Sequence, residues 1–193
     1  MRSERGTTLV EVLVATTLAV AVIGVLLGTF DSVTKATASH ERTLDARADL
    51  RQAAAEIARD LRAATSISPP VDPGDWRREI TFDVPGVDGG GATVRLSARP
   101  ADETVVREVL AGASAGTRRT VLGAARFEAD PQVFRYFDAD GGELDPDTVE
   151  GDRIAACTTR VEVTLAAGRD GGAVQTLTVG AALRSRRPEE VPC

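Results

Sequence analysis

Near its start the chain reads Arg5-Gly6-Thr7-Thr8-Leu9-Val10-Glu11, and an apolar segment follows that has no charged side chain from Val12 to Phe30. As a helix this segment would be roughly 28 Å long, which is close to the thickness of the hydrocarbon core of a bilayer. Glu11 does not suit an ordinary anchor, because a lone carboxylate costs about 2.5 to 3.5 kcal/mol near the centre of a membrane helix. We therefore expect residues 7–30 to form one membrane-spanning helix whose acid has a partner.

The residues around Gly6 carry a resemblance to a known family. A short basic leader, Gly6, the run from Thr7 to Glu11 and a long apolar segment resemble the N-terminus of type IV pilins and type II secretion pseudopilins. In that family a membrane-embedded prepilin peptidase cuts after the glycine and methylates the new terminal amine, and the acid is used in filament assembly. The resemblance implies a leader of residues 1–6, cleavage between Gly6 and Thr7, N-methylation of Thr7 and an assembly role for Glu11. The family most often has phenylalanine where this chain has Thr7.

Two other interpretations of the same residues compete with this one. A secretory signal peptide would use Arg2 and Arg5 as its basic region and the small residues 36–38 as its cleavage site. Its apolar core should be only about 7 to 15 residues long, and this one is longer and begins with an acid. In a plain single-pass anchor, Glu11 would extend from the interface into water. Only the pilin-like interpretation accounts for the glycine, the acid and the uninterrupted apolar run together.

Within the apolar segment, Gly24 and Gly28 form a small-xxx-small pair that would let another helix approach closely. The arginines of the leader precede the segment, whereas Asp31 and Lys35 follow it. The positive-inside tendency then places the N-terminus in the cytoplasm and the bulk of the chain outside the cytoplasmic membrane.

The helix is predicted to continue through residues 31–66, because neither glycine nor proline occurs between Asp31 and Ala64. One apolar stripe runs along it, and we expect this stripe to pack on the chain's own globular part, although a short coiled coil would show a similar seam. The stripe consists of Leu50, Ala54, Ile57, Leu61 and Ala64, and Leu44 lies near it one to two turns earlier. The charged residues of the other faces are expected to form a solvated surface with local pairs such as Arg42/Asp45 and Glu56/Arg59.

After the break at Ser68-Pro69-Pro70 the apolar pattern changes to alternation, which predicts strands. Residues 67–193 are therefore expected to form an antiparallel β domain, and the fold class is α+β, as the family resemblance also implies. Short apolar runs occur at 80–84, 94–96, 105–110, 121–122 and 133–137. The clearest hairpin joins 161–165 to 177–183 across a glycine-rich turn at 168–172.

Asp138, Asp140 and Glu143 with Gly141 faintly resemble a calcium loop. Gly142 and Val149 would occupy the fifth and twelfth positions of an EF-hand-like loop, and neither supplies a side-chain oxygen. We expect a solvated Asp-Gly turn and no metal.

The chain has two cysteines, Cys157 and Cys193, and in an exported protein an even pair predicts a disulfide. In the chain-entropy model the closed loop would stabilise the fold by about 3 to 4 kcal/mol.

No catalytic pattern is evident. The single histidine, His40, lies among surface-type positions of the predicted helix, and the glycines at 89–91 lack the lysine of a phosphate loop. The net charge is −6 and the arginines are interspersed with acids, so nothing indicates a nucleic-acid partner.

We expect a minor pilin or pseudopilin, neither an enzyme nor a cofactor protein, because the chain is large for the family and its loops are long. The resemblance implies prepilin peptidase, other pilins or pseudopilins and an inner-membrane assembly platform as partners. The alternative is a membrane-anchored or secreted extracytoplasmic binding module that does not enter filaments.

Overall fold

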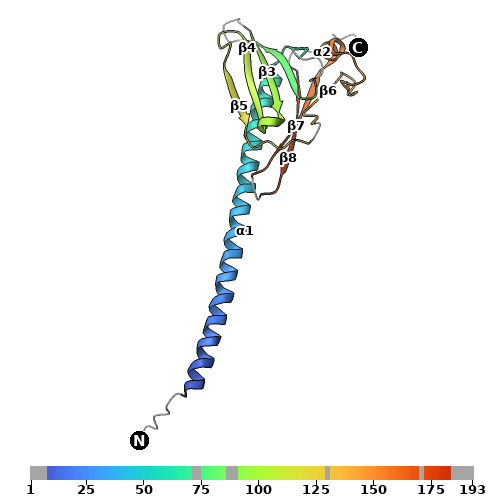
Figure 1. The fold of residues 1–193 in the computed structure, drawn as a ribbon. Coiled ribbons are helices and arrows are strands. Elements are labelled where there is room, and N and C mark those ends of the chain that lie inside the picture. The colour runs from blue at the N-terminus through green and yellow to red at the C-terminus, as the bar shows by residue number, and fades with distance from the viewer. Residues whose placement is uncertain (1–7, 71–74, 86–90, 129–130, 170–171, 184–193) are drawn as a thin grey trace. The chain divides into compact units, whose positions relative to one another are not determined.

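The computed structural model describes residues 8–70, 75–85, 91–128, 131–169 and 172–183. A long N-terminal helix, α1 (Leu9–Ala63), packs against antiparallel β-sheets, so the predicted α+β class is confirmed (Figure 1). The chain divides into two compact units, Met1–Glu41 and Arg42–Cys193, and α1 contributes to both.

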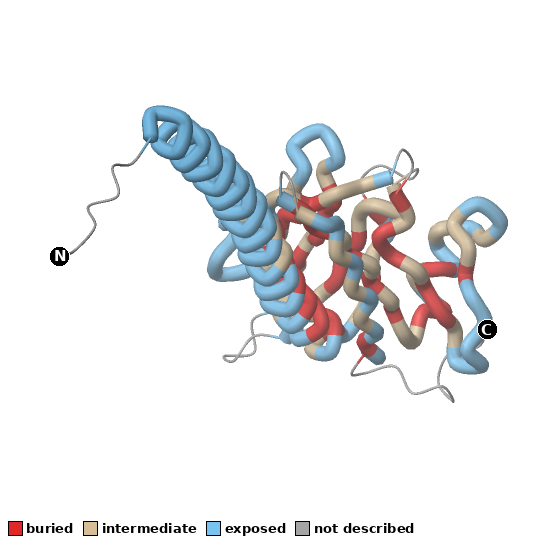
Figure 2. Tube along the Cα trace, turned by 90° about the horizontal axis from the view of Figure 1, so that it is seen from below, coloured by how far each residue is buried: buried red, intermediate tan, exposed pale blue. Residues whose placement is uncertain are grey.

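In the first unit, α1 carries its apolar side chains on the outside. Every described residue up to Thr37 is exposed, which Figure 2 shows as a continuous pale blue helix. Leu9 is 81% exposed, Ile23 54% and Phe30 78%. This part of α1 is long and apolar enough to cross a membrane.

In the second unit, α1 buries one side, shown in red in Figure 2. The predicted stripe is confirmed at Leu50, Ala54, Ile57, Leu61 and Ala64, all of which are buried. The placement of Leu44 near this stripe was wrong, because its side chain is 48% exposed, and Ala46 is the buried residue in this part of α1. Two residues separate these positions by about 200° around a helix, so the two side chains lie on different sides of α1.

Five strands form the first sheet, in the order β1-β2-β3-β4-β5, and all neighbours are antiparallel. The strands are β1 (Ser66–Ser68), β2 (Glu79–Val84), β3 (Ala92–Arg99), β4 (Thr104–Ala111) and β5 (Arg118–Leu122), with a 3₁₀ turn at Pro100–Asp102. β1 was not predicted, and the predicted end of the helix at residue 66 was wrong, because α1 ends at Ala63 and β1 begins at Ser66. It has only three residues, too few to show alternation, and it is held by pairing with β2 and by the Ser66 hydroxyl, which donates to Asp83 Oδ2 at 2.6 Å.

Three strands form the second sheet, in the order β6-β7-β8. They are β6 (Phe134–Phe137), β7 (Arg160–Ala167) and β8 (Gln175–Ala182). The predicted hairpin is confirmed, since Leu165 pairs with Leu177 and Val163 with Val179. The short helix α2 (Gly151–Cys157) was not predicted, because two turns are too short to show a helical period.

Candidate assembly helix and globular surfaces

The predicted cleavage site, Gly6 and Thr7, lies outside the described residues, so the structure begins with Thr8. The Thr8 carbonyl accepts a hydrogen bond from the Glu11 amide at 3.0 Å, and the Thr8 hydroxyl oxygen lies 3.4 Å from the same nitrogen. The spacing Thr8-x-x-Glu11 is that of a capping box, a signal that the sequence analysis missed. An acid in the first turn also interacts favourably with the positive end of the helix dipole. Glu11 is therefore well placed to stabilise the start of α1.

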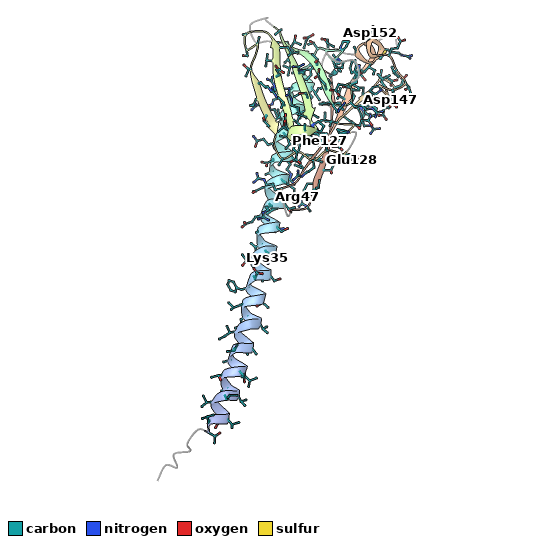
Figure 3. The ribbon with its side chains drawn as sticks, viewed as in Figure 1. Lys35, Arg47, Phe127, Glu128, Asp147 and Asp152 are labelled. Carbon is teal, nitrogen blue, oxygen red and sulfur yellow. The ribbon has the colours of Figure 1, made fainter. Side chains whose placement is uncertain are left out.

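The threonines of the apolar run satisfy their hydroxyl groups within the helix. Thr16 donates to the Val12 carbonyl at 3.0 Å, and Thr29 donates to the Leu26 carbonyl at 2.8 Å. Such bonds let a hydroxyl lie in an apolar surrounding without an unpaired donor. Directly after the apolar run, Asp31 forms an ion pair at 2.7 Å with Lys35, which Figure 3 labels. The hydroxyl groups of these threonines therefore have partners within the helix, and the apolar run ends at a helical turn with charged side chains.

The predicted packing pair, Gly24 and Gly28, lies on the exposed part of α1. A Cβ atom built at either position has no heavy atom of the described chain within 4 Å. Both positions therefore leave room for another chain, but their packing role stays a prediction.

The charged faces of α1 in the second unit are less solvated than predicted. Asp45 and Asp49 lie 3.4 and 3.1 Å from the two terminal nitrogens of Arg169, in the turn between β7 and β8. Glu56 pairs with Arg119 of β5, and Asp60 with Arg107 of β4 at 2.7 Å. The prediction of local pairs was incomplete, because Asp45 and Glu56 bind arginines of the strands and turns. Sequence spacing within one helix cannot show a partner that is distant in the chain.

Cys157 lies at the end of α2, is 3% exposed and takes part in a disulfide. Cys193, the other position of the predicted pair, lies outside the described residues. The pairing of these two cysteines therefore stays a prediction.

The turn at Asp138 is held by hydrogen bonds. Asp138 Oδ1 accepts from the amides of Asp140 at 3.0 Å and Gly142 at 2.7 Å, and Gly141 has a φ of 86°, which favours glycine. Glu143 binds Arg135 through two hydrogen bonds, which lower the pKa of Glu143. Two acids of the faint calcium pattern, Asp138 and Glu143, are thus engaged with amides and a guanidinium, and the described residues contain no group of three or more possible metal ligands.

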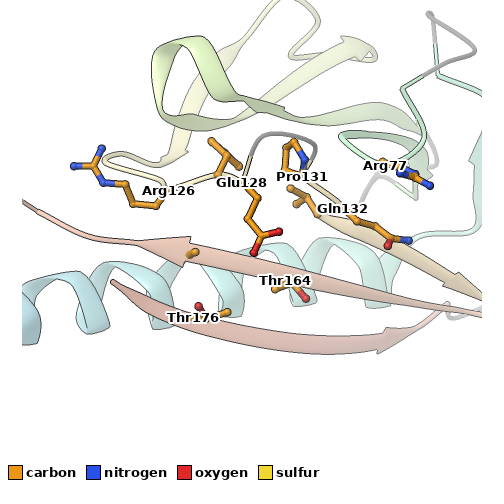
Figure 4. Close-up of a pocket in the computed structure, with 10 residues that line it drawn as sticks. Arg77, Arg126, Glu128, Pro131, Gln132, Thr164 and Thr176 are labelled. Atoms are coloured by element: carbon orange, nitrogen blue, oxygen red, sulfur yellow. The ribbon is translucent and has the colours of Figure 1, made fainter. Parts of the chain in front are cut away.

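A cleft of about 350 Å³ opens beside β7 and β8 (Figure 4). Polar and charged side chains supply much of its lining: Arg77, Arg126, Glu128, Gln132, Thr164 and Thr176. Both arginines have acid partners, since Arg77 pairs with Asp147 and Arg126 with Glu103. The cleft therefore offers hydrogen-bonding groups, and its guanidinium charges are already balanced.

No protein-family model matches this chain, and a comparison with curated proteins finds no match either.

Proposed function

We propose that the chain is a minor pilin or pseudopilin, a structural subunit of a filament of the type IV pilus or type II secretion kind. The observation that carries this proposal is the exposed apolar run of α1, which directly follows Glu11. The same helix then continues into a second part that has one side buried in the core. A subunit of this design waits in the cytoplasmic membrane with its N-terminus in the cytoplasm and its globular unit outside. It then enters a filament through the apolar run.

Glu11 is the residue that would set the register between subunits. After cleavage at Gly6, the methylated amine of Thr7 on one subunit can meet the Glu11 carboxylate of its neighbour. At about 4 Å and an effective dielectric constant near 20, the attraction is on the order of 4 kcal/mol before desolvation. The carboxylate would then be neutralised where a lone charge is costly.

Processing provides the first test, because the leader and Gly6 predict one cleavage site. Mass spectrometry of protein recovered from membranes should find a methylated Thr7 as the first residue, and Gly6→Ala should block cleavage. An N-terminus at Ser39 would instead establish a secretory signal peptide. An intact Met1 would leave a plain membrane anchor.

Assembly provides the decisive test. Glu11→Ala should leave membrane insertion and processing intact but strongly reduce the amount of the subunit in sheared filaments, because the amine of the neighbour loses its partner. Asp31→Ala is the matched control, since Asp31 is an exposed acid of the same helix whose pair with Lys35 is exposed and contributes little. If Glu11→Ala protein is cleaved, methylated and found in filaments at the parental level, the assembly role is wrong.

A further inference from the structure

The described strands have four sheet edges, and only that of β8 is left open to another strand. β1 is three residues long, β5 carries Arg118 and Arg119, and the outer edge of β6 is bonded to neighbouring loops. Short length, charge and covering loops are the ways in which proteins block an edge. β8 has eight residues, Gln175–Ala182, and none is charged or proline. β8 is therefore the edge that can accept a further strand.

The free hydrogen-bonding groups of β8 follow from its register. The Leu183 amide donates to the Thr159 carbonyl at 2.9 Å, and the pairing continues through Ala181 with Val161 and Val179 with Val163. Because the groups of an antiparallel strand alternate in direction, the amides of the even-numbered residues point away from β7. The four residues with outward amides, Thr176, Thr178, Gly180 and Ala182, are all exposed.

A groove of about 160 Å³ lies between this edge and α1. Its lining comes from Arg47, Leu50 and Arg51 of α1 and from Gln175, Thr176 and Leu177 of β8. Arg47 donates through Nε to the neutral Gln175 side chain at 2.8 Å. Arg51 is exposed, and within the described ranges it has no acid partner. The groove therefore presents guanidinium groups whose charge is not balanced.

The charges of α1 are separated around the helix. At 3.6 residues per turn, Arg51 and Arg62 lie about 40 and 60° from Arg47 around α1, and Arg59 lies about 120° from it. The positions between these arginines on this side are alanines. The acids of the same segment, such as Asp49 and Asp60, lie about 140 to 180° from Arg47 and Arg51 around the helix, where they bind the arginines of the strands and turns. In a chain with a net charge of −6, this side of the helix is a local positive surface beside the open edge.

We propose that the β8 edge and the adjoining groove bind an extended strand of a partner polypeptide that carries carboxylate side chains at alternate positions. The strand adds to the sheet through the outward amides and carbonyls of β8, as in known cases of β-strand addition. Arg47 and Arg51 are about 6 Å apart along the helix, and alternate residues of a strand are about 6.6 to 6.8 Å apart. Two acids separated by one residue can therefore face the two arginines.

The binding experiment uses the full chain in detergent micelles and a fluorescent peptide of about eight residues in which glutamate alternates with threonine. Fluorescence anisotropy should show saturable binding by this peptide and much weaker binding by a peptide with lysine in place of glutamate. N-methylation of alternate peptide amides removes the backbone donors without changing the charge. It should lower the affinity by at least about tenfold.

Two variants test the two parts of the site. Thr178→Pro removes an outward amide that β7 does not use, so it should abolish strand addition while circular dichroism shows the fold unchanged. Arg51→Glu should weaken binding of the glutamate peptide by about tenfold, because it reverses one of the two facing charges. Arg153→Glu makes the same change on the exposed face of α2 and should leave binding unchanged.

Several outcomes would overturn the proposal. If the N-methylated peptide binds as well as the parent, the surface binds the peptide through its charge alone and no strand is added to the sheet. If single-stranded DNA of equal charge binds as tightly and is sensitive to Arg51→Glu alone, the site is one for nucleic acid. If no peptide binds, a partner strand is excluded. Self-association lost in Thr178→Pro would then assign the edge to a second copy, and slow amide exchange at Thr178 in the monomer would assign it to the chain's own tail.

Discussion

At the scale of single residues, Tyr136 is a large, fully buried side chain that carries a polar group into the core. Its exposed fraction is 0%, and its hydroxyl donates to the Trp76 carbonyl at 2.8 Å. The two rings meet edge to face with centroids 5.3 Å apart. Burial raises the pKa of Tyr136 well above its usual value of 10.0, and the carboxylates of Glu79 and Asp75 add to this effect.

Tyr136 is the only tyrosine of the chain, so its ionisation can be followed without interference. The raised pKa means that the folded state favours the neutral phenol. This contribution to stability is fully present below about pH 10 and is lost as the pH rises toward the folded-state pKa. Absorbance near 295 nm should therefore show no tyrosinate until the chain unfolds, whereas the chain in denaturant should titrate near pH 10. A reversible midpoint near 10 in the folded chain would contradict the described burial.

At the scale of elements, Gly151 fixes how closely α2 approaches the core. A Cβ atom at this position would lie 2.8 Å from Nε1 of Trp76, and the ring of Trp76 is 3% exposed. The indole has no free space into which it can turn cheaply, because well-packed interiors resist added volume. The first residue of α2 must therefore be very small.

Gly151→Ala should lower the free energy of unfolding by about 1 to 3 kcal/mol through this overpacking. Gly123→Ala is the matched control, because a Cβ atom there meets nothing within 4 Å and Gly123 has no positive φ. Denaturant titrations followed by the fluorescence of Trp76, the single tryptophan, will compare the two variants. Equal effects of the two substitutions would show that the Trp76 contact does not limit position 151.

The elements that could be predicted from sequence are those with a long repeat. The buried side of α1 and the β7/β8 hairpin have apolar residues at regular spacing over several turns or pairs, and both predictions are confirmed. β1 and α2 are too short to show a period. The partners of Asp45 and Glu56 were missed because ion pairs between distant segments depend on the fold. The assembly role of Glu11 rests on a local motif and stays a prediction.

At the scale of the whole molecule, the boundary after Glu41 separates two kinds of helical surface. Before it, the apolar side chains of α1 are exposed. After it, burial starts at Ala46 and continues through Leu61. The exposed part adds no buried residue to the second unit, so the fold of residues 42–193 should not depend on it. The first turns of α1 after the boundary do contribute contacts to the second unit. Asp45 and Asp49 bind Arg169, and Arg47 binds Gln175.

Two shortened chains test this division. A chain that starts at Arg42 should be soluble and keep the β-sheets, since none of the described residues that it loses is buried. A chain that starts at Leu50 also loses the buried Ala46 and the contacts of α1 with Arg169 and Gln175. Both shortened chains begin with a charged amine at the positive end of the helix dipole, so this unfavourable interaction is the same in both. The longer chain should be more stable by about 1 to 3 kcal/mol, or roughly 2 to 12 °C in Tm by circular dichroism. If the chain from Arg42 is unfolded or aggregates, residues 1–41 are needed for the fold and the division at Glu41 is wrong.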